Sequence, residues 1–443
     1  MATITKRWYA LAALALCTLA VGLDGTVLSV ALPTLAGDLG ASTGDLQWFT
    51  TSYLLVLAAA LLPAGMLGDR FGRQGCCSAG WLLDHFHWGS VFLINLPLVV
   101  FGLIAVAAWV PESHGDRGRR FDPAGTALSA AGLVAVTYGI IEAGERGWGD
   151  PRTQVLIASG VLSLVVLVLW QRRAAAPLID LGLFRNRAFT GGTLFATIAG
   201  FAFFGLLFAL PQLFQAVGGQ DAFGTGLRLL PVIGGLVAGA RLAGALTGRL
   251  GTRVIIAAGL ALMAAGLFAG AGTSSTSTSN PTSFSTEGYV PYWVTAFWIT
   301  LAGIGVGFTM PSSMNAALGA LTPERSGAGN GLIQALRQVG SAIGVAVLGM
   351  LLNSGYREAV DTTGLPAPMA DAVRDSATSG AAVAGQLGDP ALLASVRAAF
   401  VSGMDLALLV AGGVAAAGAV LALIVMPARG TETEPVVLAE SGV

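Results

Sequence analysis

A single aspartate lies inside the first apolar run of the sequence, where an ionised side chain would be costly. Asp24 follows Trp8 in a run that extends to Pro33, and at 1.5 Å per residue it lies about 24 Å along a helix. A charge near the membrane centre costs about 2.5 to 3.5 kcal/mol, so such a residue normally faces a cavity or a partner. A carboxyl group in that place can alternate between protonation and cation binding. We interpret Asp24 as a coupling residue, with structural helix pairing as the alternative.

A basic residue within an apolar segment is the second candidate for chemistry. Arg241 lies inside the run from Leu229 to Thr247, and it is a candidate partner for an acid or a residue of a substrate pathway, although structural pairing explains it equally well. Glu142 and Arg337 lie nearer the ends of their runs. Their long side chains are expected to extend toward the membrane surface.

The residues do not support metal binding, ATP-driven transport or catalysis. His85 and His87 flank an aromatic residue beside Trp88, which is typical of an interfacial aromatic belt. No set of acids or cysteines at ligand spacing accompanies them, so we expect no metal. A phosphate-binding G-x-x-x-x-G-K-[ST] motif is absent, which disfavours ATP-driven transport. We expect no cofactor, and a membrane-embedded enzyme is the weakest of the competing functions because no catalytic cluster is found.

The composition places these residues in a bilayer. The 443 residues are 54% hydrophobic and 11% charged, which excludes a water-soluble globule with a polar surface. A net charge of -1 without a dense basic run argues against nucleic-acid binding. A bilayer core needs about 20 apolar residues per helix, and eleven segments qualify: Trp8–Pro33, Trp48–Gly68, Ser90–Val110, Pro123–Glu142, Thr153–Trp170, Phe189–Phe214, Leu229–Thr247, Val254–Gly272, Tyr292–Leu318, Gly329–Leu352 and Phe400–Met426.

Glycine pairs and two polar stretches organise these helices. The pairs Gly235 and Gly239, Gly244 and Gly248, and Gly340 and Gly344 have the spacing that lets helix backbones approach closely. Residues 273–288 predict a solvated loop. Residues 354–397 predict a longer polar loop with room for an amphipathic helix.

The sequence also repeats itself weakly. "VALPTLAGDLG" at 30–40 is similar to "FALPQLFQAVG" at 208–218, and "GMLGDRFGR" at 65–73 is similar to "GALTGRLGTR" at 244–253. Two landmarks at nearly one offset indicate two related halves, as in transporters built from parallel repeats. Chance similarity between apolar segments is the alternative.

These motifs resemble those of the major facilitator superfamily. "GMLGDRFGR" resembles its loop between helices two and three, and "LDGTVLSVALP" at 23–33 resembles the first helix of its fourteen-helix drug:proton antiporters. Residues 176–189 and 327–349 resemble the same branch. In the family, the loop works as a latch for alternating access. The resemblance implies that role for Gly65, Leu67, Asp69, Arg70, Gly72 and Arg73.

The segment from Gly68 to Ser90 departs from the family pattern. After the loop motif, the second repeat has four apolar segments, whereas the first has only Ser90–Val110 before "GDRGRR". About three helices, including the glycine-proline motif of antiporters, have no counterpart. The placement of arginines also indicates a loss. The arginines on both flanks of Ser90–Val110 predict a cytoplasmic position for their flank, and a single crossing helix cannot have both ends in the cytoplasm. A natural variant, a gene deletion and a sequence error explain the loss equally well.

The sequence therefore predicts an all-α, polytopic, major facilitator-like bundle with about 11 helices instead of 14. Residues 1–110 are expected to form a truncated first half, 111–188 two linking helices with a cytoplasmic loop, and 189–443 a six-helix second half. The resemblance implies proton-driven export of amphipathic or cationic drugs, or of antibiotics, across the plasma membrane. A non-transporting scaffold or receptor is the main alternative, and the loss puts export by this chain in doubt.

Overall fold

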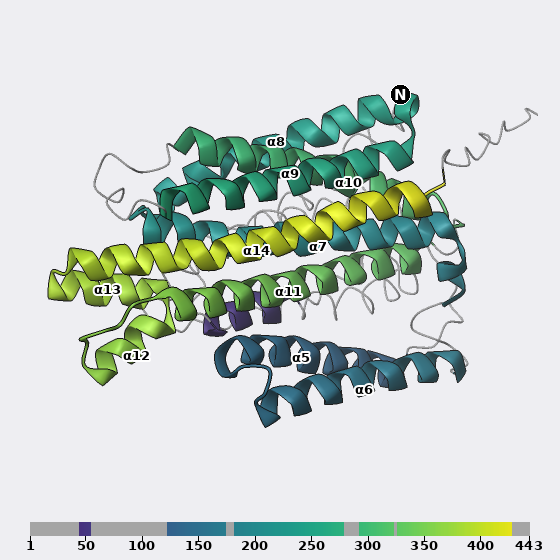
Figure 1. Cartoon of the computed structure of the whole chain (residues 1–443). Coiled ribbons are helices and arrows are strands. Elements are labelled where there is room, and N and C mark those ends of the chain that lie inside the picture. Colours follow the sequence, from purple (N-terminus) through teal and green to yellow (C-terminus); the bar gives the residue numbers. More distant parts are fainter. Residues whose placement is uncertain (1–43, 55–121, 174–180, 279–291, 323–325, 428–443) are drawn as a thin grey trace, which may run out of the picture.

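Helices form all the regular structure of the residues that the computed structural model describes, which are 44–54, 122–173, 181–278, 292–322 and 326–427 (Figure 1). No strand occurs among them, so the predicted all-α class is confirmed. Eight helices in these ranges are long and apolar enough to cross a membrane. They are α5 (Pro123–Arg146), α6 (Pro151–Arg173), α7 (Arg187–Gln212, continued by the π-helical turn η3, Leu213–Val217), α8 (Ala222–Leu250), α9 (Thr252–Thr278), α10 (Tyr292–Leu318), α11 (Ser326–Ala359) and α14 (Pro390–Val425).

The helix starts follow from local sequence. Asp122 caps α5, since its Oδ1 accepts from the Gly125 backbone N at 2.8 Å and Pro123 occupies the first turn. The same carboxylate accepts from Trp170 Nε1 of α6 at 3.1 Å, which fastens the start of α5 to the end of α6. Asn186 caps α7 in the same manner, and Asp389 with Pro390 begins α14.

The eight helices coincide with the last eight predicted segments, but the polar stretches are more helical than predicted. The expected loop 354–397 is wrong in extent: α11 continues to Ala359, α14 begins at Pro390, and α12 (Ala367–Asp375) and α13 (Ala377–Leu387) lie between them. α9 also continues to Thr278, into the expected loop 273–288. Extending an existing helix adds a hydrogen bond per residue without a new nucleation cost, so polar residues at its end stay helical.

The described helices pack as one bundle with a helix pair at its side (Figure 1). α10 packs against α8 and α9, α14 against α9 and α11, and α7 against α11 and α10. α5 and α6 pack against each other, and α5 contacts α11. The short η2 (Leu181–Arg185) precedes α7. Of the first three predicted segments, residues 48–54 are described, inside a helix of residues 44–54; the rest lie outside the described residues.

The three glycine pairs differ in what they pack against. A Cβ on Gly239 would overlap the Ile304 backbone of α10, and a Cβ on Gly344 would overlap the Phe201 backbone of α7. These two close approaches confirm the interpretation for the pairs that contain them. By contrast, no described atom lies within 4 Å of a Cβ built on Gly244 or Gly248. The third pair is therefore open on the surface of α8.

Because of this difference, the same glycine-to-alanine substitution should affect the melting temperature differently at Gly344 and at Gly244. Gly344→Ala should lower the melting temperature, because a methyl group against the Phe201 backbone costs about 1 to 3 kcal/mol as overpacking. Gly244→Ala should leave it unchanged or raise it, since alanine is roughly 0.5 to 1 kcal/mol better than glycine within a helix. Thermal unfolding in detergent measures both. Equal destabilisation by the two variants would contradict the assignment of the contacts.

Candidate functional site

Four polar side chains form a stripe along α11, within a helix of membrane-spanning length. Gln334, Arg337, Gln338 and Ser341 occupy positions i, i+3, i+4 and i+7, so they share one side of the helix. Gln338 and Ser341 are fully buried, and Ser341 Oγ donates to the Arg337 carbonyl oxygen at 2.9 Å. The stripe places a basic group and two amides inside the apolar bundle.

Arg337 is held within the bundle. It lies about 16 Å from the start of α11 at 1.5 Å per residue, and a Cβ on Gly200 of α7 would lie 3.4 Å from its Cγ. Its Nε donates to Gln334 Oε1 at 2.9 Å. Glu142 is also engaged locally, with its Oε2 2.6 Å from Arg146 Nε. Each of these two side chains therefore contacts a partner about one turn nearer the end of its own helix.

The helix of residues 44–54 covers α11 next to this stripe. Its Leu46 and Leu54 share an apolar cluster with Phe208 of α7 and with Ala342 and Val345 of α11. Gln47 lies directly over Gly349, where a Cβ would be 2.7 Å from the Gln47 Cδ. On the other side, the Trp48 and Tyr138 rings meet edge to face at 5.0 Å. This helix therefore fills the groove between α5, α7 and α11.

Several side-chain oxygen atoms on these two packed helices are buried without hydrogen bonds. They are Gln47 Oε1 and Thr51 Oγ1 on the helix of residues 44–54, and Gln338 Oε1 and Asn353 Oδ1 on α11. We call these four residues the polar seam. An unpaired buried polar group costs about 1 to 3 kcal/mol, so the contact is weaker than an apolar one of equal area. Water would satisfy these oxygens if the two helices separated, which lowers the cost of opening the seam.

The predicted coupling residues fall in different places. Asp24, Gly65, Asp69, Arg70, Gly72 and Arg73 lie outside the described residues. Arg241 is described, and it lies exposed on α8, on the side of the open Gly244 and Gly248. The structure therefore does not bring Arg241 together with the seam. No group of three or more potential metal ligands occurs among the described residues.

The second copy of the loop motif forms a tight turn. α8 ends at Leu250 and α9 begins at Thr252, so Gly251 alone connects them. Its φ of 81° is a left-handed value that favours glycine, and its N–H donates to the Thr247 carbonyl oxygen at 2.9 Å. Residues 244–253 therefore form a helix, a one-residue turn and the start of the next helix.

Sequence reasoning missed Asp405 and the seam. Asp405 is the only charged residue between Phe400 and Met426, and it is half-buried on α14 and engaged in a polar interaction. The signal that identified Asp24, one acid in an apolar run, applies equally to Asp405. Gln47 and Thr51 carry no such signal, because neutral polar residues are common at the start of an apolar segment.

Comparisons with known proteins agree with this architecture. The model of the Major Facilitator Superfamily matches residues 14–74 and 75–345. The tetracenomycin C resistance and export protein of Streptomyces glaucescens is 29% identical over 97% of this chain and 94% of its own length. The multidrug efflux pump LfrA of Mycolicibacterium smegmatis is 28% identical over 91% and 93%. A crystal structure of a bacterial homologue of the human lysosomal transporter Spinster, in an inward-facing and occupied conformation, has a similar fold, with a TM-score of 0.54, 16% identity and coverage of 95% and 97%.

The comparisons also bear on the segment from Gly68 to Ser90. The two parts of the family match meet between Gln74 and Gly75. The alignment with the tetracenomycin exporter extends over 516 positions, and a chain of 443 residues leaves at least 73 of them empty. Three helices with their turns occupy about that length. This alignment therefore leaves empty about as many positions as three helices would fill.

Proposed function

Since the chain belongs to the Major Facilitator Superfamily, and is accordingly a multi-pass membrane transporter, we propose that its inherited function is the proton-driven export of small drug-like or antibiotic molecules. The observation that carries this proposal is likeness over nearly the whole chain to a tetracenomycin C exporter and a multidrug efflux pump. The polar seam supports it, because alternating access requires an interface between helices that can open and become hydrated.

We place the chain in the plasma membrane with the start of α7 in the cytoplasm. Arg172 and Arg173 end α6, Arg187 begins α7, and Arg249 ends α8. If the loops alternate sides, the side of these helix ends also carries most of the other arginines: Arg117, Arg119, Arg120, Arg185, Arg253, Arg325 and Arg429. The opposite side carries fewer: Arg146, Arg152, Arg357, Arg374 and Arg397. By the positive-inside rule, the richer side is cytoplasmic. The segment of α12 and α13 then lies on the outer side.

We propose that the chain divides at residues 110 and 188, into a truncated first half, a linking pair and a six-helix second half. The packing of α5 on α6 as a separate pair supports the linker. Exposed positions at both ends of α8 support the loss, since Phe223, Leu227 and Leu230 near its start are all more than half exposed, and Gly244 and Gly248 near its end are open. Such positions are suited to close helix packing that the described residues do not provide.

Within this scheme, Asp24 and Arg241 carry proton and substrate coupling, and the loop of Gly65 to Arg73 acts as the latch. In the second copy of the loop motif, Gly248 stands where the first has an acid. The charge-assisted contacts of Asp69 and Arg70 would therefore hold one conformer from one side only. The substrate belongs to the class of amphipathic or cationic drugs, and no resident cofactor takes part.

Vesicle transport tests the proposal. A chain completed with the missing helices, reconstituted in liposomes, should move a fluorescent cationic dye when a pH gradient is imposed and stop when a protonophore collapses it. Asp69→Asn should slow turnover more than it weakens dye binding, since the latch acts on interconversion. Dye binding with no gradient-driven flux would instead support a receptor or scaffold and refute export.

A further inference from the structure

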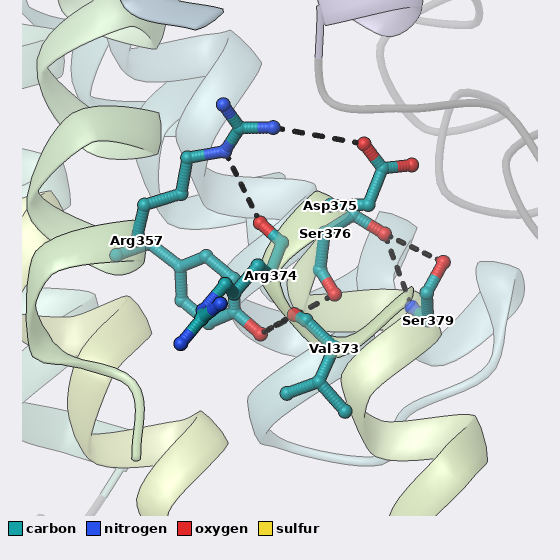
Figure 2. A network of polar contacts seen from close by, with 7 residues as sticks. Arg357, Val373, Arg374, Asp375, Ser376 and Ser379 are labelled. Carbon is teal, nitrogen blue, oxygen red and sulfur yellow. Dashed lines mark hydrogen bonds and ion pairs between the residues drawn. The ribbon is translucent and has the colours of Figure 1, made fainter. Parts of the chain in front are cut away.

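A polar network fastens the outer end of α11 to the segment of α12 and α13 (Figure 2). Arg357 Nη2 lies 3.8 Å from Asp375 Oδ1, and Arg357 Nε donates to the Arg374 carbonyl oxygen at 3.3 Å. The neighbouring Tyr356 is buried, and its hydroxyl donates to the Val373 carbonyl oxygen at 2.6 Å. The end of α12 is therefore tied to α11 by one ion pair and two hydrogen bonds to backbone oxygens.

The turn beyond Asp375 is also fixed. Ser376 caps α13, since its Oγ accepts from the Ser379 backbone N at 3.1 Å and contacts Ser379 Oγ at 2.9 Å (Figure 2). Asp375 is therefore the last residue of α12, next to a one-residue connection whose Ser376 caps the following helix. Its carboxylate is positioned rather than free to move away from its neighbours.

A carboxylate of the first half faces this network. Asp45 begins the helix of residues 44–54, two residues before Gln47, which lies over Gly349 of α11. Arg357 is about two turns beyond Gly349 on α11. Partial burial and the charge of Asp45 raise the pKa of Asp375, whereas Arg357 opposes them. The negative charge of Asp45 therefore opposes ionisation of Asp375, whose carboxylate is paired with Arg357.

We propose that Asp45, Arg357 and Asp375 form a charged clamp that closes the outer end of the polar seam, and that protonation on the outer side favours the closed state. The clamp joins the first half to the second, and it lies where the seam would admit water. The inference rests on the proposed function, because outer closure matters only as a step of transport.

The sign of the pH effect follows from the surroundings of Asp375. The charged groups on the elements around it are Arg357 and Glu358 of α11, Asp371 and Arg374 of α12, Asp389 and Arg397 near the start of α14, and Asp45. Of these, Arg357 and Asp45 affect the pKa of Asp375. Partial burial and the negative charge of Asp45 together raise that pKa more than Arg357 lowers it. A carboxyl group whose pKa is raised in the closed state favours closure when protonated, so closure weakens as the pH rises through that pKa.

Distance measurements on the purified 443-residue chain test the clamp without measuring transport. Spin labels at Phe49→Cys and Met369→Cys, two exposed positions, report the distance between the two sides after Cys17, Cys76 and Cys77 are replaced by serine. As the pH rises from about 4, near the ordinary aspartate pKa, to about 8, the distances should shift from one short population to a mixture with a longer one.

Substitutions distinguish an effect of the clamp from a general loss of helix packing. Asp375→Asn should give the short population at every pH, because the amide mimics the protonated acid. In Arg357→Gln, the population with the longer distance should appear at a lower pH than in the unmodified chain. Asp371→Asn, an exposed acid on the same helix, should behave as the unmodified chain. Distances independent of pH, or a pH effect that survives Asp375→Asn, would overturn the clamp and leave the export proposal to its own vesicle test.

Discussion

Export by the 443-residue chain should remain at background, and it should appear when about 80 residues forming three helices are restored between Gly75 and Gly80. The physical reason is the odd number of missing crossings. Arginines on both flanks of the predicted helix Ser90–Val110 favour the cytoplasm, and one crossing cannot satisfy both. Part of the chain would therefore insert with its charges on the unfavourable side.

The second half shows what the missing helices would contact. α8 packs on α10 through Gly235 and Gly239, and it leaves Arg241, Gly244 and Gly248 uncovered among the described residues. In lipid, an exposed arginine costs a few kcal/mol unless it reaches a partner or the membrane surface. Restored helices would supply a protein surface for this side and close a pathway between the halves.

The measurement is drug resistance and dye efflux in a pump-deficient host, at matched membrane abundance of the two forms. A short form carrying Asp24→Asn provides the inactive baseline. Robust gradient-dependent efflux by the unmodified short form would refute the prediction. It would mean that eleven predicted helices suffice for transport.

Much of the second half could be predicted from apolar run length, because a bilayer imposes the same length on every crossing. The segment 292–318 has the same bounds in α10, and the remaining described helices contain most of their predicted runs. The prediction failed at polar helix ends. Between Ala359 and Pro390, Ser376 caps α13 and Asp389 caps α14, and hydropathy does not report such caps.

Less of the candidate site than of the fold could be predicted from the sequence. A charge in an apolar run is visible in the sequence, which is why Arg241 was found. The seam consists of Gln47, Thr51, Gln338 and Asn353, which become significant only when two helices distant in the chain bury their oxygens together. Pairing of that kind depends on helix rotation, and one sequence does not determine it. The different surroundings of Gly239, which is buried against α10, and Gly244, which is open, also depend on helix rotation.

Asp24→Asn in the completed chain should abolish efflux driven by a pH gradient while leaving the protein in the membrane. An amide keeps the size and polarity of the carboxyl group, but it cannot exchange a proton. If Asp24 binds a proton or a cationic drug in alternation, the amide removes the coupling and spares helix packing. Dye efflux under an imposed pH gradient measures the loss, and dye exchange without a gradient shows whether the carrier still changes conformation.

Asp405→Asn provides the matched control. Asp405 is also the one charged residue of its apolar run, but it already has a polar interaction and lies on α14, which packs against α9 and α11. We expect its amide variant to retain gradient-driven efflux, because its carboxylate serves a contact within the second half. Unchanged coupling in Asp24→Asn would remove Asp24 from the mechanism. Loss of coupling in Asp405→Asn alone would move the proton site to α14 and assign Asp24 a structural role in helix pairing.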